Sequence, residues 1–142
     1  MRLLASAVAF LVLAIILSAS PASAARVEAR IDIGSQTMTV IVDGARRHVW
    51  KVSTGKRFYG TPTGTFRPKS LKRHQNSDRY ENAPMPHSIF FTGGYAIHGT
   101  GAVGKLGRPV SHGCVRLAPG NAAALFALVK ANRSTTRIVV TR

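Results

Sequence analysis

The chain has 142 residues, with 20 Lys and Arg against 5 Asp and Glu, and a single cysteine. This length suits one domain, and one cysteine excludes an intramolecular disulfide framework, a multi-cysteine zinc ribbon and an iron–sulfur cluster. The formal net charge of +15 favours an anionic partner, such as a nucleic acid, a membrane or an acidic polymer, and does not choose among them.

The N-terminus has the pattern of a secretory signal peptide. An early arginine, Arg2, precedes an apolar run over 3–17, and Ala22-Ser23-Ala24 forms an A-x-A cleavage site. We therefore expect a signal peptide at 1–24 and a mature domain at 25–142. An uncleaved anchor is the alternative, because no charge lies between Arg2 and Arg26. Export to the periplasm or cell wall argues against nucleic acid as the partner.

The predicted mature domain is mainly β, with one helix in its C-terminal half. Apolar and charged residues alternate over 26–33, as in a half-buried strand, and Asp43-Gly44 is a hairpin signal. Residues 60–66 are typical of a turn that enters a short strand. The same reasoning predicts strands at 26–33, 37–42, 49–52, 89–92, 95–98, 114–117 and 137–141, and a helix at 119–132.

Two segments between these elements are unusual. Residues 67–87 hold five basic and few apolar residues, and a loop of this length in a small domain is usually functional or disordered. Residues 93–113 contain seven of the 13 glycines. Such a segment needs positive φ angles or a close approach of the backbone to a ligand.

The glycine-rich segment ends on a group of nucleophilic and basic side chains. A cysteine attacks an acyl carbon as the thiolate, and His98 or His112 could take the proton of Cys114 and hold the thiolate in an ion pair. On an extended strand, His112 and Cys114 would point to the same side. The Gly113-Cys114 backbone could donate N–H groups to an oxyanion. A catalytic zinc held by the two histidines and Cys114, or a plain core cysteine, stays open on these residues alone.

The same residues resemble a known signature. His98-Gly99-Thr100 followed by Ser111-His112-Gly113-Cys114-Val115-Arg116-Leu117 resembles the L,D-transpeptidase (YkuD-type) catalytic domain. Three upstream segments are similar to other elements of that family: Ser53-Thr54-Gly55-Lys56, Thr61-Pro62-Thr63-Gly64 and residues 83–91. The similarity covers nearly all of residues 26–128.

The resemblance implies a β-sandwich-like fold of mixed sheets with one helix, and a cysteine transpeptidase of peptidoglycan tetrapeptide stems. It implies that Cys114 is the nucleophile and His98 the base, oriented by the Gly99 carbonyl. Ser111, His112 and Gly113 would shape the site or its oxyanion pocket, and Arg116 would bind a substrate carboxylate. No cofactor and no metal are implied.

The acceptor stays open at this point. It could be a second stem, a free D-amino acid or an outer-membrane protein, and water would give carboxypeptidase activity. We expect a monomer. A non-catalytic wall-binding protein is the alternative in another functional class, although both Cys114 and His98 are present.

Overall fold

The computed structural model describes residues 20–142, so most of the predicted signal peptide lies outside the described residues. This part of the chain holds nine strands, one α-helix and two short 3₁₀ helices. Their bounds are β1 Val27–Asp32, β2 Thr37–Val42, β3 Ala45–Lys51, β4 Gly64–Phe66, β5 Ser70–Lys72, β6 Ser88–Thr92, β7 Tyr95–Gly99, η1 Val103–Lys105, β8 Val115–Leu117, α1 Pro119–Ala131, η2 Arg133–Thr135 and β9 Thr136–Thr141.

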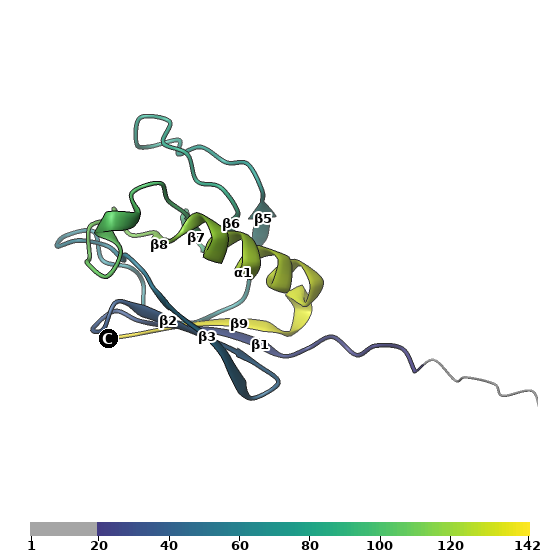
Figure 1. The fold of residues 1–142 in the computed structure, drawn as a ribbon. Coiled ribbons are helices and arrows are strands. Elements are labelled where there is room, and N and C mark those ends of the chain that lie inside the picture. The colour runs from purple at the N-terminus through teal and green to yellow at the C-terminus, as the bar shows by residue number, and fades with distance from the viewer. Residues whose placement is uncertain (1–19) are drawn as a thin grey trace, which may run out of the picture.

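The strands form a five-stranded sheet in the order β3-β2-β1-β9-β4 and a four-stranded sheet in the order β5-β6-β7-β8. The larger sheet lies below the smaller sheet and α1 in Figure 1. Both sheets are mixed, because β1 pairs in parallel with β9 and β7 in parallel with β8. The predicted class, mainly β with mixed sheets and one helix, is confirmed.

The first hairpin follows directly from its turn residues. Asp43 and Gly44 both have positive φ, 49° and 82°, as a tight hairpin turn requires. The Asp43 carboxylate also accepts a hydrogen bond from the Arg26 N–H at 2.9 Å. The strand after the turn begins earlier than the sequence indicates, at Ala45, because Arg46 and Arg47 are exposed on an edge strand and give no apolar pattern.

One hydrophobic core is shared by the two sheets and the helix. The alternation predicted for β1 is confirmed, since Val27, Ala29 and Ile31 are buried. Val115 and Leu117 of β8 and Ile97 of β7 face the same core. The helix packs against β6 and β7 and adds four buried residues: Ala122, Leu125, Phe126 and Val129.

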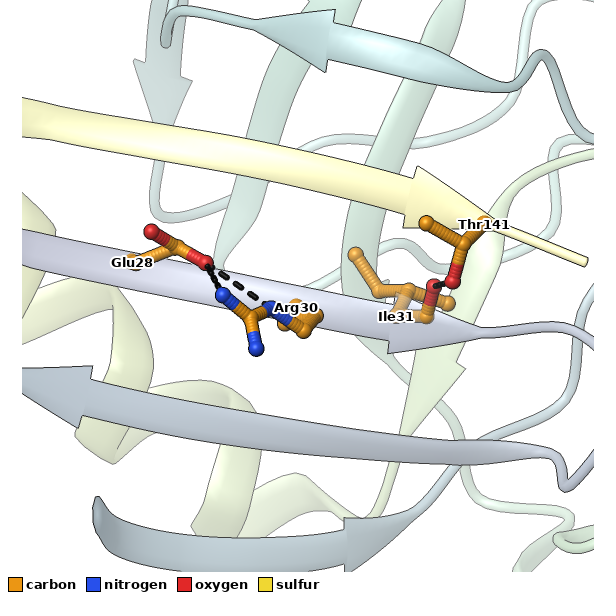
Figure 2. A network of polar contacts seen from close by, with 4 residues as sticks. All are labelled: Glu28, Arg30, Ile31 and Thr141. Carbon is orange, nitrogen blue, oxygen red and sulfur yellow. Dashed lines mark hydrogen bonds and ion pairs between the residues drawn. The ribbon is translucent and has the colours of Figure 1, made fainter.

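The other face of β1 lies at the surface. Figure 2 shows Glu28 and Arg30 paired along this strand, with Oε1 of Glu28 2.6 Å from Nη2 of Arg30. The same view shows the Thr141 hydroxyl of β9 directed at the Ile31 carbonyl, at 3.4 Å. An ion pair at the surface contributes little to the free energy of unfolding, so we attribute most of the stability to the buried core.

The segment expected as a long loop has its own structure. Residues 70–72 form β5, and residues 73–87 form an irregular hairpin, here called the flap, which extends from the top of the molecule in Figure 1. Its two sides are joined by backbone hydrogen bonds from His87 to Arg73 at 2.8 Å and from Met85 to Gln75 at 2.7 Å. Polar residues paired through their backbones leave no alternating pattern, which is why the sequence did not predict this hairpin.

Within residues 20–142, no helix is long and apolar enough to cross a membrane. The apolar run over 3–17 lies outside the described residues.

Candidate active site

A cavity of about 630 Å³ opens between the flap and the ends of β7 and β8. His98, His112, Cys114 and Arg116 all line it, together with ten residues from the flap and its base, among them Tyr80 and Met85. The two chain segments predicted to carry the chemistry therefore meet in one cavity. The flap, whose role the sequence analysis left open, forms much of the cavity wall.

The parallel pairing of β7 with β8 brings the reactive residues together. His98 is the register partner of Arg116, so their side chains share a face of the sheet. Cys114 lies two residues before Arg116, immediately ahead of β8. The neighbours Ile97 and Val115 point the other way, into the core. One face of this strand pair supports the fold, and the opposite face supplies the site.

His98 is held in one tautomer by its own backbone neighbour. Its Nδ1 lies 2.8 Å from the Gly99 carbonyl oxygen, as the resemblance implied. A carbonyl only accepts hydrogen bonds, so Nδ1 carries the ring proton and Nε2 has a free lone pair. His98 is 6% exposed, and this bond also fixes the orientation of its ring.

Burial disfavours the charged form of both His98 and Cys114. Desolvation lowers the pKa of His98 to about 4, although its bond to Gly99 acts in the opposite direction. Desolvation also raises the pKa of the Cys114 thiol, against the lowering effects of a hydrogen bond from the Ala96 backbone and of the Arg116 charge. Both shifts favour the neutral thiol and the neutral imidazole over the ion pair that the sequence left possible. The cause is the poor solvation of either charge in this cavity.

Arg116 supplies an unpaired positive charge to the site. Its charge lowers the pKa values of both His98 and Cys114. The single salt bridge among residues 20–142 joins Arg30 to Glu28, so no described carboxylate neutralises Arg116. A half-buried cation in a cavity is well placed to receive an anionic group of a ligand.

The turn that carries Cys114 is built around the Ser111 hydroxyl. This hydroxyl donates to the Cys114 carbonyl at 2.6 Å and accepts from the Gly113 N–H at 3.0 Å. The Gly113 N–H is thus already engaged, whereas the Cys114 N–H makes no hydrogen bond within residues 20–142. Of the two backbone amides predicted to donate to an oxyanion, only the Cys114 N–H is still available for a ligand.

Gly113 could not be another residue without a rearrangement. Its φ is +121°, and an added Cβ would lie 2.5 Å from Cε1 of Tyr95. This backbone conformation interrupts the strand geometry assumed for 114–117, which begins at Val115 instead. His112 and Cys114 therefore do not lie on one extended strand, as the sequence analysis assumed, although both line the cavity.

Two motifs earlier in the chain, residues 53–56 and 61–64, hold this turn in place through hydrogen bonds. The buried Thr61 hydroxyl donates to the Gly113 carbonyl at 2.7 Å and accepts from the Gly55 N–H at 2.9 Å. The Thr54 carbonyl accepts from the Ser111 N–H at 3.0 Å. The sequence contained these motifs but did not indicate what they do, because the contacts to Gly113 and Ser111 join residues more than 50 positions apart.

His112 lies between two aromatic rings. The Tyr80 ring of the flap stacks on it at 4.1 Å between centroids and an interplanar angle of 12°, and Tyr59 meets it edge-on at 4.9 Å. The sequence analysis missed both tyrosines, since nothing in their local pattern marks them. His112 is thus held by aromatic contacts, whereas His98 is held by a hydrogen bond to the backbone.

No group of three or more His, Cys, Asp or Glu side chains within residues 20–142 could hold a metal ion. His98, His112 and Cys114 thus line one cavity without forming the zinc site considered from the sequence.

Comparison with known proteins agrees with this geometry. The family model of the YkuD L,D-transpeptidase catalytic domain matches residues 26–140. A curated relative, named as the L,D-transpeptidase YkuD of Bacillus subtilis (strain 168), is 26% identical over 116 residues, which are 79% of this chain and 64% of that protein.

Two solved structures are similar over most of the chain. An L,D-transpeptidase from Mycobacterium smegmatis is 30% identical with a TM-score of 0.74, over 83% of this chain and 59% of that one. The L,D-transpeptidase LdtMt1 in complex with imipenem is 26% identical with a TM-score of 0.71, over 82% of this chain and 59% of that one. The chain spans less than two thirds of the length of each of these three relatives.

Proposed function

Since the chain belongs to the L,D-transpeptidase catalytic domain family, we propose that it is an exported cysteine transpeptidase of peptidoglycan stem peptides. The observation that carries this proposal is the pairing of β7 with β8. It supports the proposal because the strand that carries His98 runs next to the strand that follows Cys114, and both residues line one cavity. The Nδ1 of His98 is occupied by the Gly99 carbonyl, so that only Nε2 is free to take a proton.

The first half of the reaction forms a thioester. His98 Nε2 takes the thiol proton as the Cys114 sulfur attacks the carbonyl at the L-centre of diaminopimelate in a tetrapeptide stem. The C–N bond to D-Ala then breaks, and the nitrogen of D-Ala leaves with the proton that His98 had taken. Burial disfavours both the imidazolium and the free thiolate, so we infer that the proton moves as the sulfur attacks.

Two groups of the site stabilise charge in this step. The free Cys114 N–H is our candidate donor to the oxyanion that forms at the attacked carbonyl. Arg116 is our candidate partner for a free stem carboxylate, since no described acid neutralises it.

The second half transfers the acyl group to an amine. His98 removes a proton from the incoming amine, the amine nitrogen attacks the thioester, and the Cys114 sulfur leaves and recovers its proton. We propose a second stem, a free D-amino acid or the amine of an outer-membrane protein as the acceptor. The periplasm or cell wall, where such stems occur, is the proposed location.

Intact-mass spectrometry of the protein with purified muropeptides tests the proposal. We expect an adduct whose mass equals that of the stem less D-Ala, and a transfer product when an amine is added. Cys114→Ser is the control and should give neither, because a serine hydroxyl is a poor nucleophile without a base adapted to it. Wild-type adduct formation by the Cys114→Ser protein would rule out Cys114 as the nucleophile.

A further inference from the structure

A second concave surface lies away from the catalytic cavity, between α1 and the base of the flap. This groove of about 510 Å³ has a floor of small residues from one face of the helix, Ala123, Ala127 and Ala131. Arg73, His87 and Lys130 complete its lining together with Phe126. None of these residues lines the catalytic cavity.

The groove is held in shape by contacts on both of its sides. The His87 ring meets the Phe126 ring edge-on, at 5.4 Å between centroids, and so joins the flap base to the helix. The His87 N–H donates to the Arg73 carbonyl at 2.8 Å, which fixes the two flap residues that face the groove. The Arg73 and Lys130 side chains are both exposed beside it.

Further cations continue from the groove around the C-terminal end of α1. The Arg133 guanidinium donates to the Lys69 carbonyl, and Arg67 Nη1 donates to the Ser134 carbonyl at 3.1 Å. These contacts place the segment before the flap along the end of the helix. We call the resulting surface the basic strip, and its members are Arg67, Lys69, Arg73, Lys130 and Arg133.

No acidic residue lies in the basic strip. The five acids of the chain are Glu28 and Asp32 of β1, Asp43 of the first hairpin, and Asp78 and Glu81 of the flap tip. Guanidinium groups match phosphate oxygens in geometry, and three of the five cations are arginines. Among residues 20–142, the exposed large hydrophobic side chains are Val49, Phe58, Tyr59, Tyr80 and Val103. All five lie outside the strip, so the strip has no exposed large apolar side chain to insert into a bilayer.

We propose that the basic strip binds a phosphodiester-linked anionic polymer, which enters the groove between Arg73 and Lys130 and continues past Arg133. Charge complementarity is the basis of the assignment. Arg73 and Lys130 are exposed at the lining of the groove, and three more exposed cations without an acid continue beyond it around the end of α1. The proposal does not rest on the transpeptidase reaction, because binding requires no turnover at Cys114.

The test is fluorescence anisotropy of a labelled glycerol phosphate oligomer with the purified full chain at several salt concentrations. The variant R73Q/K130Q should bind at least about tenfold more weakly, and the slope of log affinity against log salt should fall by about 1.4 for two lost contacts. The matched control R46Q/R47Q removes two exposed charges from β3 and should lose less than about threefold.

Three results would overturn the proposal. An equal loss in both variants would mean that net charge alone attracts the polymer. Unchanged polymer binding by R73Q/K130Q, with a lower Tm, would mean that the cations serve only the C-terminal end of the helix. Loss of binding to phosphatidylglycerol vesicles without loss of polymer binding would assign the strip to a lipid surface.

Discussion

The Thr61 hydroxyl donates to the Gly113 carbonyl at 2.7 Å, across 52 residues of sequence. The same oxygen accepts the Gly55 N–H at 2.9 Å, so one buried side chain joins two backbone segments beneath the nucleophile. Gly55 tolerates no side chain here, because an added Cβ would lie 1.6 Å from the Tyr59 carbonyl oxygen. The position of Cys114 therefore depends on a residue that never touches the cavity.

Replacing Thr61 by valine should destabilise the protein and disturb the site. The change keeps the shape of the side chain but leaves the buried Gly55 N–H and Gly113 carbonyl without this partner, which costs about 1–3 kcal/mol for each group. Urea unfolding should show the loss of free energy, and the rate of Cys114 acylation should fall with it. Thr61→Ser retains the hydroxyl and should recover most of both quantities. Equal losses in the two variants would contradict the bridging role.

Much of the fold could be predicted because its signals are local. The alternation in β1, the Asp43-Gly44 turn and the helix that begins at Pro119 all follow from neighbouring residues. Cys114 and His98 were identified from the spacing of their motif, and the structure places both in one cavity.

The rest depends on contacts between distant segments. Tyr80 has no local pattern to mark it, yet it stacks on His112. Thr61 lies in a motif that the sequence analysis identified, but the motif does not indicate its contact with Gly113. The shifts in the pKa values of Cys114 and His98 could not be predicted from the sequence either. They depend on burial, which motif spacing does not reveal.

The proposed export can be tested at the cleavage site. Protein from the cell envelope should begin at Ala25, because Ala22-Ser23-Ala24 fits a signal-peptide cleavage site. Ala24→Glu should block cleavage and leave residues 1–24 attached, while Ser23→Thr should still be cut. N-terminal sequencing and intact mass report both outcomes. A wild-type N-terminus at Met1 or Arg2 would favour the membrane anchor instead.

Stability should decrease in mild acid because of His98. The folded-state pKa of about 4 lies below the unfolded value of 6.5, so the unfolded chain binds the proton more readily between these values. The contribution is complete above pH 6.5 and is lost as the pH falls toward 4, by about 3 kcal/mol in the free energy of unfolding.

Urea unfolding at a series of pH values measures this dependence. His98→Gln should flatten the decrease between pH 6.5 and 4, because the group that takes up the proton on unfolding is gone. His74→Gln removes an exposed imidazole from the flap and serves as the control. The same pH dependence in wild type and His98→Gln would exclude His98 as its origin.

The stack of Tyr80 on His112 should limit access to Cys114. An aromatic pair of this kind contributes about 0.5–1.5 kcal/mol, so Tyr80→Ala should raise the alkylation rate of Cys114 by iodoacetamide about two- to tenfold. Tyr80→Phe keeps the ring and should react at the wild-type rate. An unchanged rate in Tyr80→Ala would show that the flap tip does not control entry to the cavity.

The two histidines should differ most clearly in their effect on acylation. Removal of a general base costs about 10²–10⁴-fold, so His98→Ala should lose that much of the acylation rate. His112→Ala should lose less, because His112 is held by Tyr80 and Tyr59 and acts through the shape of the site. Intact-mass spectrometry with purified muropeptides measures the acylation rate of each variant.

The pH profile of Cys114 alkylation identifies which histidine assists the thiol. With His98 present and its pKa near 4, the rate should change little between pH 5 and 8, because Nε2 is already free to accept the thiol proton. In His98→Ala the rate should follow the thiolate fraction and rise about tenfold per pH unit, since burial raises the pKa of the thiol. His112→Ala should keep the flat profile. If His112→Ala alone acquired the steep profile while His98→Ala reacted like wild type, the base would be His112.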